Sequence, residues 1–530
     1  MPRLSSLPSQ ARERGQRRRR LTATSALAAP LAALALLLMP AAAPALNLEV
    51  KNTKDSGPES LRAAIEASNL ATDPDTIVIT ATGEIKLETQ LPFTNSPLDI
   101  VGPGPEQLTV SRDPAAAAFG IFFFRGATLL SGMTISGGQA ASGAGIEAGG
   151  PLTLTRVVVR GNKVTGGSGS RGAGISIPTP TSPRPLILRE TLVTENVVEN
   201  TRTAGQTFGG AIAAEDGGTI ERSTIAGNRI EFPSATGAAE AAGAGISIVG
   251  GASEIRSSTI AGNSIVVNQA AQNPVLKGAG VFGEQSGGDV PMITGSTIAN
   301  NSISASTPGQ GSNVFNGLFR DTIVAGGVGG ANCAGVVVGS FGFNLEDGTS
   351  CNFTNPTDLN TNPLLAPTLA DNGGPTPTFA LQPGSPAIDQ GNAFGATTDQ
   401  RGMPRIGDFQ AITNAAGGDG SDIGAFEATA PPFKEPPPPK DTKDTSPPQT
   451  TIAKKPRRQS AQRLAKFRFS SSEPGSRFEC KLDKGRFKPC ANPFKRRVKP
   501  GKHRIEVRAI DKAGNADPTP ARYAWRVVGG

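Results

Sequence analysis

A short motif that recurs along the middle of the chain constrains the fold more than any other feature of the sequence. Ser-Thr-Ile-Ala-Gly-Asn stands at 223–228 and again at 258–263, and degenerate copies lie on both sides. The third motif positions are Ile135, Val159, Val193, Ile225, Ile260, Ile298 and Ile323, and consecutive ones are 24 to 38 residues apart. Self-similarity at such periods indicates a repeat architecture in which each unit stacks on the next.

The residues between these copies favour one architecture. Glycine turns that lead into short β-type runs interleave with the first motif at 143–146, 172–175, 209–212, 243–246 and 278–281. The runs are short, alternating and β-branched, and no amphipathic helix pattern lies among them, which excludes helical repeats. We therefore predict an all-β protein, a right-handed parallel β-helix with two or three short strands per coil and coils about 4.8 Å apart. The column of Ile and Val would line its core.

Asparagines end most copies of the first motif, at Asn162, Asn196, Asn228, Asn263 and Asn301. Asparagine tolerates the left-handed backbone of a turn. Stacked side-chain amides can also bond from one coil to the next. We predict a structural asparagine ladder, with ordinary turn chemistry as the alternative.

The first 45 residues have the pattern of an export signal. Arg17 to Arg20 precede an apolar run from Leu27 to Met39, and Ala43-Pro44-Ala45 offers small residues at a cleavage spacing. We predict a signal peptide over 1–45 and a secreted or cell-surface protein, exported by either the Sec or the twin-arginine route. A retained anchor is the alternative, although the run is shorter than the roughly 20 residues that span a bilayer. No later segment is apolar enough to cross a membrane.

Four cysteines fit an oxidising exterior. Cys333 and Cys351 are 18 residues apart and Cys480 and Cys490 are ten apart, whereas 129 residues separate the inner two. This spacing favours two local disulfides over the other two pairings, and four free thiols are the alternative.

Both ends of the repeat region resemble a known family. Ser60 to Ile65 resembles the opening of secreted bacterial β-helix proteins of the CSLREA type, with Glu59 in place of the cysteine of that pattern and Ala63 in place of its glutamate. The segments 371–378, 383–389, 398–402 and 422–427 resemble the choice-of-anchor Q closing region. The resemblance implies a β-helix of the pectin-lyase-like superfamily over 46–428, exported and surface-associated. Its cap and first coils would occupy 46–130 and its closing region 331–428. We also expect a short capping helix over 61–68 with Ser60 as N-cap.

A second domain follows a proline- and lysine-rich linker at 429–447. Short alternating runs separated by turns over 448–530 predict a small immunoglobulin-like β-sandwich. The stretch from Ser471 to Asn515 resembles the immunoglobulin-like or fibronectin-III-like modules of exported actinobacterial proteins. That resemblance implies a spacer or adhesion module.

Charge divides the chain in the same way. Residues 46–431 carry a net charge of −14 and residues 432–530 a net charge of +16. The basic candidates are Arg457, Arg458, Arg486, Lys488, Lys495, Arg496, Arg497, Lys499, Lys502 and Arg504. They predict docking on an anionic cell-wall polymer or acidic polysaccharide. A solvated face, or one that packs on the chain's own acidic body, is the alternative. Nucleic acid is not expected, because no helix is offered to a groove and stacking aromatics are few.

Catalytic signals are weak. His503 is the single histidine, which excludes histidine triads and multi-histidine metal sites, and we expect neither a metal nor a cofactor. Polysaccharide hydrolases and lyases need convergent carboxylates or a positioned base. The candidates are Glu215, Asp216, Glu284 and Asp289, which follow glycine turns in separate repeats.

The function predicted from the sequence is non-enzymatic. The β-helix contains no His, Tyr or Trp, which weakens sugar binding by aromatic stacking. We predict an exported rod displayed for adhesion or carbohydrate contact, held on anionic polymers by the basic domain. A polysaccharide lyase or glycoside hydrolase of pectin-lyase-like shape is the alternative.

Overall fold

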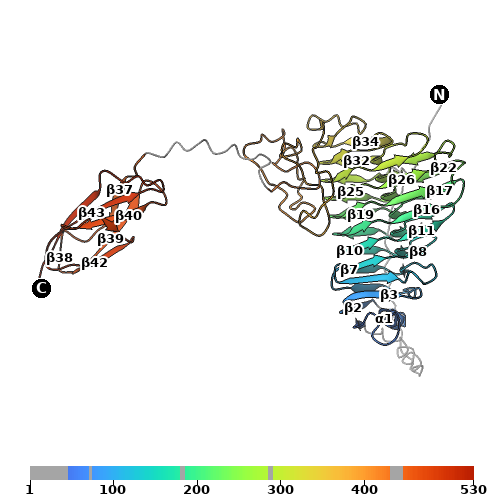
Figure 1. The fold of residues 1–530 in the computed structure, drawn as a ribbon, viewed down its shortest axis with the longest axis horizontal. Helices are drawn as coiled ribbons and strands as arrows, with labels where there is room; N and C mark the ends of the chain where they lie inside the picture. Colours follow the sequence, from blue (N-terminus) through green and yellow to red (C-terminus); the bar gives the residue numbers. More distant parts are fainter. Residues whose placement is uncertain (1–45, 71–73, 179–184, 285–289, 430–445, 530) are drawn as a thin grey trace, which may run out of the picture. The chain divides into compact units, whose positions relative to one another are not determined.

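The computed structural model describes residues 46–70, 74–178, 185–284, 290–429 and 446–529, which form two compact units divided between Thr429 and Ala430 (Figure 1). The predicted signal peptide lies outside these residues, and so does the predicted linker except at its ends. No helix among the described residues is long and apolar enough to cross a membrane.

The first unit is a parallel β-helix, as the repeats predicted. A full coil contributes one strand to each of five stacks, and the strands within every stack pair in parallel. The sequence predicted only two or three strands per coil. The sequence did not reveal stack 5, defined below, because its strands are only two to four residues long and one of them, 239–242, consists of alanine and glutamate, which carry little β signal.

Stacks 1 to 3 form one continuous sheet around the main apolar core. Stack 1 contains β6 (Phe122–Phe124), β9 (Ile146–Ala148), β13 (Ile175–Ile177), β18 (Ile212–Ala214), β23 (Ile246–Val249), β28 (Val281–Glu284), and the starts of β32 (Val314–Arg320) and β34 (Cys333–Ser340). Stack 2 contains β1 (Asn47–Val50), β2 (Asp75–Ile79), β4 (Leu98–Val101), the first halves of β7 (Thr128–Ser136) and β10 (Leu152–Arg160), β14 (Leu186–Arg189), β19 (Gly218–Glu221), β24 (Ser253–Arg256), β29 (Met292–Thr294) and the ends of β32 and β34. Stack 3 contains β3 (Gly83–Leu87), β5 (Leu108–Arg112), the second halves of β7 and β10, β15 (Leu192–Thr194), β20 (Thr224–Ala226), β25 (Thr259–Ala261), β30 (Thr297–Ala299), β33 (Ile323–Ala325), β35 (Leu345–Glu346) and β36 (Leu359–Asn360).

Stacks 4 and 5 enclose a second apolar core. Stack 4 contains β8 (Gln139–Ala140), β11 (Lys163–Gly166), β16 (Val197–Asn200), β21 (Arg229–Phe232), β26 (Ser264–Val267) and β31 (Ser302–Ser304). Stack 5 contains β12 (Ser170–Arg171), β17 (Gly205–Phe208), β22 (Ala239–Ala242) and β27 (Val275–Lys277).

The predicted column of Ile and Val lies in stack 3, with one correction. Its first six members pair in register and are fully buried. The seventh member is Val324 and not Ile323, because Ile298 pairs with Val324. Ile323 pairs with Thr297 on the outer face, where it packs with Ala387 and Ile423. The copy at 321–326 lacks the final asparagine that would have fixed its alignment.

Asparagine side chains join successive coils at the turn after stack 3. The Nδ2 of Asn162 donates to the Oδ1 of Asn196 at 2.9 Å. The same bond, at 2.9 to 3.0 Å, links Asn196 to Asn228, Asn228 to Asn263 and Asn263 to Asn301. It continues to Asn313 and Asn332, which the motif did not identify.

Additional structure covers the β-helix at its N-terminal end and along one side. Helix α1 (Leu61–Ser68) occupies the predicted range, with the Ser60 hydroxyl accepting from the Ala63 amide at 3.2 Å. Segment 361–428 contains no helix or extended strand and lies on the outer face of stack 3. There, Gln400 donates through Nε2 to the Thr224 hydroxyl at 2.7 Å and accepts from the Thr259 hydroxyl at 2.6 Å.

The second unit contains two small sheets, mostly antiparallel, an arrangement compatible with an immunoglobulin-like sandwich. The three-stranded sheet contains β37 (Thr450–Lys454), β39 (Leu464–Ser471) and β42 (Phe494–Arg497). The five-stranded sheet contains β38 (Gln459–Ser460), β44 (Ala521–Val527), β43 (Gly501–Ile510), β40 (Arg477–Leu482) and β41 (Lys488–Pro489). Phe467, Trp525 and Ile505 are central to its core. Both predicted disulfides are confirmed: Cys333 bonds to Cys351 in the first unit and Cys480 to Cys490 in the second.

Candidate functional site

The outer face of the three-stranded sheet of the second unit carries only positive charge. Successive side chains of a strand point to opposite faces, and in β39 Ala465, Phe467 and Phe469 are buried while Lys466 and Arg468 are exposed. Lys466 pairs directly with Lys495, Arg468 with Lys454 and Leu464 with Arg497. We call the set Lys454, Lys466, Arg468, Lys495 and Arg497 the cationic face.

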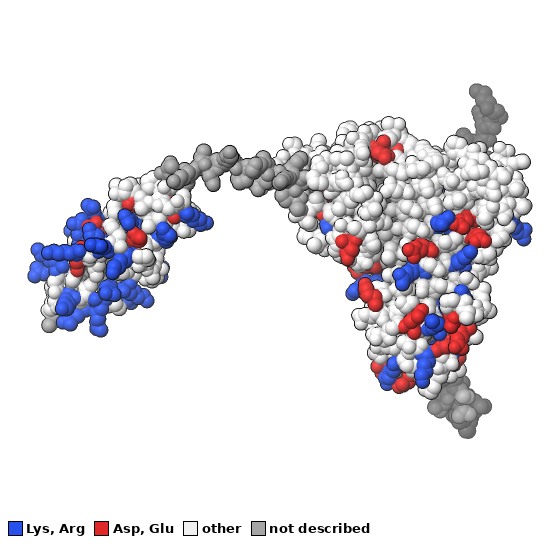
Figure 2. All heavy atoms as spheres, in the orientation of Figure 1, with Lys and Arg blue, Asp and Glu red and all other residues white. Residues whose placement is uncertain are grey.

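Among the described residues, no carboxylate compensates the positive charge of this face. Strands β37, β39 and β42 contain no Asp or Glu. None of the five side chains makes an ion pair or a side-chain hydrogen bond with another described residue. Like charges directly opposite each other on a sheet are destabilising, and two such pairs occur here. Lys and Arg side chains gather over this unit in Figure 2.

The five-stranded sheet differs from it, because two carboxylates pair with four of the eight cations in its strands. Glu506 lies 3.2 Å from Arg504, 3.6 Å from Arg522 and 3.7 Å from Lys481. Glu479 accepts from Arg508 at 2.7 Å. The two sheets therefore present chemically different faces, one free of carboxylates and one in which half of the cations are paired with a carboxylate.

The sequence identified the charge of the domain but not this distribution. All ten predicted basic residues are exposed, but only Lys495 and Arg497 belong to the cationic face. Arg496 pairs with Ala465 and so lies on the opposite side of the sheet. The other seven lie in or beside strands of the five-stranded sheet: Arg457 and Arg458 before β38, Arg486 and Lys488 near β41, and Lys499, Lys502 and Arg504 around β43. The prediction missed Lys454, Lys466 and Arg468. The alternation of cations with Ala and Phe over 464–469 was the signal that could have found two of them.

Two of the four acidic candidates of the β-helix share a hollow. Glu215 and Glu284 line a pocket of about 360 Å³ with Arg171, which forms an ion pair with Glu215. Asp216 follows Glu215 but does not line this pocket. Asp289 lies outside the described residues. This hollow brings two carboxylates and an arginine together on the outer surface of stacks 1 and 5.

Buried ionisable groups cluster where segment 361–428 meets the β-helix. Arg405 donates to Asp321 at 2.5 Å and lies 3.6 Å from Glu427, and all three side chains are almost fully buried. Burial raises the pKa of Asp321 to about 7, against the opposing effect of Arg405. Burial, with the nearby charge of Asp422, raises the pKa of Glu427 to about 8. Glu427 and Asp422 belong to a closing motif, Arg405 lies between two of these motifs, and Asp321 comes just before β33, so the cluster ties segment 361–428 to the β-helix.

The closing motif at 371–378 begins with a turn, Asp371 to Gly374, that is rich in oxygen-bearing side chains. Asp371 accepts from the Gly373 amide at 3.0 Å, and Asn372 donates to the Thr378 carbonyl at 2.9 Å, as in ordinary turns. Among the described residues, no three His, Cys, Asp or Glu side chains are grouped so that they could hold a metal ion.

Comparisons with known proteins leave the family open. No family model matches the chain, and no curated protein matches it. A solved structure of a mannuronic acid-specific polysaccharide family 6 lyase from human gut microbiota aligns with a TM-score of 0.22 and 13% identity, covering 57% of this chain and 87% of the lyase. A similarity of this size does not carry the lyase's activity to this chain.

Proposed function

We propose that this chain is an exported surface protein whose second unit binds an anionic polymer through the cationic face and so displays the β-helix. The observation that carries the proposal is the absence of carboxylates from a sheet surface with five exposed cations, two pairs of them directly opposed. Anionic groups spaced along a polymer would relieve this repulsion. The two disulfides and the signal predicted over 1–45 support an oxidising, extracellular setting.

Binding of the full-length protein to immobilised polygalacturonate and polyphosphate tests this proposal. The double variant Lys466→Ala/Arg468→Ala removes two cations from the cationic face. Lys481→Ala/Arg522→Ala removes the same charge from the five-stranded sheet and is the matched control. We expect the first variant to bind at least about tenfold more weakly than the control, since a localised site depends on a few residues. Binding should also weaken as salt rises, because the face is exposed.

Two results would contradict the proposal. Equal weakening in both double variants would mean that overall charge, and not this face, causes binding. No binding to either polymer at low salt would remove the anionic partner altogether.

A second candidate function, polysaccharide cleavage, is favoured by one observation. Arg171, Glu215 and Glu284 line one hollow, and a carboxylate pair or a carboxylate with a base is the minimum that glycosidic cleavage requires. The test is release of new reducing ends from neutral and acidic polysaccharides by the wild type and by Glu284→Gln. Release that disappears in the variant would establish the enzyme, and no release from any polymer would eliminate it.

A further inference from the structure

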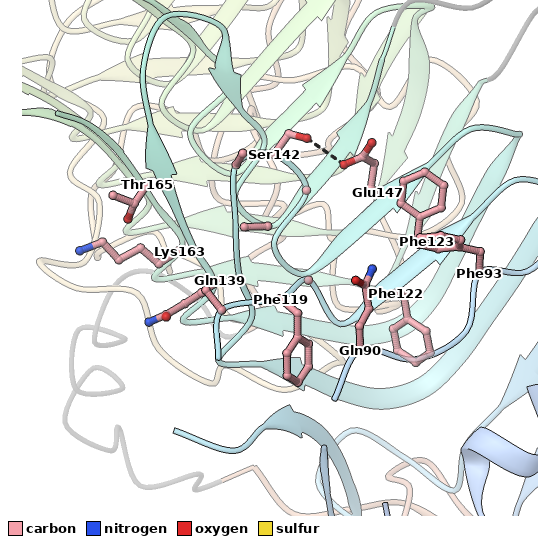
Figure 3. A pocket seen from close by; sticks show the side chains of 15 residues that line it. Gln90, Phe93, Phe119, Phe122, Phe123, Gln139, Ser142, Glu147, Lys163 and Thr165 are labelled. Carbon is pink, nitrogen blue, oxygen red and sulfur yellow. Dashed lines mark hydrogen bonds between the residues drawn. The ribbon is translucent and has the colours of Figure 1, made fainter. Parts of the chain in front are cut away.

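The β-helix has another hollow, lined by aromatic rings, at the N-terminal ends of stacks 1 and 4. It has a volume of about 590 Å³, within the range of small-molecule sites. Its walls carry Phe93, Phe119 and Phe123, with Gln90, Gln139 and Glu147 among the polar groups (Figure 3). We call it the aromatic cleft. The repeat pattern did not predict it, because these phenylalanines belong to none of the repeated motifs.

Strand geometry explains why these rings face outward. In β6 the side chains of Phe122 and Phe124 are buried in the core, so the alternation of the strand directs Phe123 to the surface. Thr94 forms a parallel bridge with Phe124, which brings Phe93 beside Phe123 with ring centroids 4.7 Å apart and planes tilted by 57°. Phe93 is 43% exposed. Two adjacent rings left at the surface beside a cavity indicate a binding surface.

The polar lining indicates an uncharged ligand. Glu147 of strand β9 pairs directly with Phe123 of the neighbouring strand β6, and its carboxylate accepts from the Ser142 hydroxyl at 2.8 Å. Lys163, the cation of the lining, is engaged by Glu199 at 2.7 Å. Two charges remain at the cleft: the carboxylate of Glu147, which can accept from hydroxyl groups, and the guanidinium of Arg125, which lies over the Phe93 ring at 5.3 Å from its centroid. Because these two charges are opposite, the cleft has no net charge that would select an ion.

A neutral sugar chain meets both requirements. The C–H face of a pyranose ring is apolar and packs on an aromatic ring, while its hydroxyls donate and accept hydrogen bonds at the edge. Gln90 and Gln139 supply amides that can do both. An apolar peptide would leave these amides without partners and would bury the charge of Glu147, both of which are unfavourable. We propose that the aromatic cleft binds a segment of a neutral hexopyranose polysaccharide, with Phe93 and Phe123 as its platform.

This proposal is independent of the cationic face, so either site can fail alone. The test is binding of cellohexaose, maltohexaose, mannohexaose and hexagalacturonate to the full-length protein by saturation-transfer NMR and calorimetry. We expect at least one neutral hexaose to bind, and we expect binding of hexagalacturonate, which the cationic face is proposed to take, to be unchanged in Phe93→Ala/Phe123→Ala. Phe93→Ala/Phe123→Ala should reduce affinity for the neutral sugar at least about tenfold. Phe341→Ala, which removes a 56% exposed ring outside the cleft, should leave the affinity unchanged.

Several outcomes would overturn the proposal. They are binding of no neutral hexaose, loss of hexagalacturonate binding in Phe93→Ala/Phe123→Ala, or equal affinity of that variant and the wild-type protein for the neutral sugar. The single variant Phe93→Ala, at the more exposed position, provides the test should the double variant lose its native circular dichroism. An apolar dye that binds the cleft and is not displaced by any sugar would assign it to an apolar ligand instead.

Discussion

Among single residues, the glycine turns of the β-helix contact the asparagines that end the first motif. In Gly243-Ala244-Gly245-Ile246, the alanine enters the second core and the isoleucine the first. A Cβ on Gly245 would lie 2.9 Å from the Asn263 amide nitrogen, so this position must be glycine to make room for the ladder. The sequence indicated a glycine turn and a turn asparagine separately. Their contact could not be predicted, because the two residues lie 18 positions apart and are brought together only by the path of one coil through stacks 1 to 3.

The ladder makes a clear stability prediction. Asn228 is fully buried, accepts from the backbone and side chain of Asn196, and donates to Asn263 and to the Val193 carbonyl, all at 2.9 to 3.0 Å. Asn228→Ala leaves several buried polar groups without partners, at about 1–3 kcal/mol each. We expect a loss of about 3 kcal/mol or more in the free energy of unfolding of the β-helix.

Urea unfolding followed by far-UV circular dichroism measures this loss. The control is Asn268→Ala, which removes an exposed asparagine whose Nδ2 donates to the Pro233 carbonyl at 2.8 Å. It should lower the free energy of unfolding by less than about 1 kcal/mol. A cost for Asn228→Ala no larger than that of the control would show that the ladder adds no stability.

Among the elements, segment 361–428 shows why the closing motifs could be found in the sequence while their contacts could not be predicted from it. Asp399 accepts from the side chain of Arg401 at 2.8 Å and from the Glu427 amide at 3.1 Å. Gln400 bridges Thr224 and Thr259, more than 140 residues away along the chain. The polar motif residues thus form a buried network that holds the segment on stack 3. A sequence pattern gives no information on such distant partners.

The stability of the β-helix should depend on pH because of this network. Folding raises the pKa of Asp321 to about 7 and that of Glu427 to about 8, above the ordinary value near 4. Between the ordinary pKa near 4 and these raised values the folded form holds more protons than the unfolded form, so stability is highest below about pH 4 and falls as pH rises from about 4 to about 8. Circular dichroism melts should give a higher midpoint at about pH 5 than at about pH 8.

Glu427→Gln should flatten this dependence, since it removes the group with the higher pKa. Trp525, the single tryptophan, follows the second unit separately by fluorescence. A β-helix midpoint that rises from pH 5 to pH 8 would contradict the assignment of these protonation states.

The three-stranded sheet of the second unit should become more stable when one positive charge of the cationic face is reversed. Lys466→Glu places a carboxylate directly opposite Lys495, turning a repulsive pair into an attractive one. We expect the second unit to gain about 0.5 kcal/mol at low salt while anionic polymers bind more weakly. Trp525 fluorescence during urea unfolding measures the gain. The gain should shrink as salt screens the pair, and a loss of stability at low salt would contradict the interpretation of the face.

At the scale of the whole molecule, the sequence predicted the two units and their opposite charges, and the structure reveals where the charge of the second is exposed. The β-helix and the antiparallel unit were both predictable, because periodicity and alternation are local signals. The distribution of charge between the two sheets was not, because strand pairing decides it: Lys466 and Lys495 are 29 residues apart in sequence and adjacent in register.

Lysine footprinting can locate the surface of the second unit that an anionic polymer covers. The full-length protein is acetylated briefly with and without polygalacturonate or polyphosphate, and the modification of each lysine is measured by mass spectrometry. We predict that polymer protects Lys454, Lys466 and Lys495 of the cationic face and leaves Lys481 and Lys512 as reactive as in free protein. Uniform protection of all these lysines, or protection confined to Lys481 and Lys512, would contradict it.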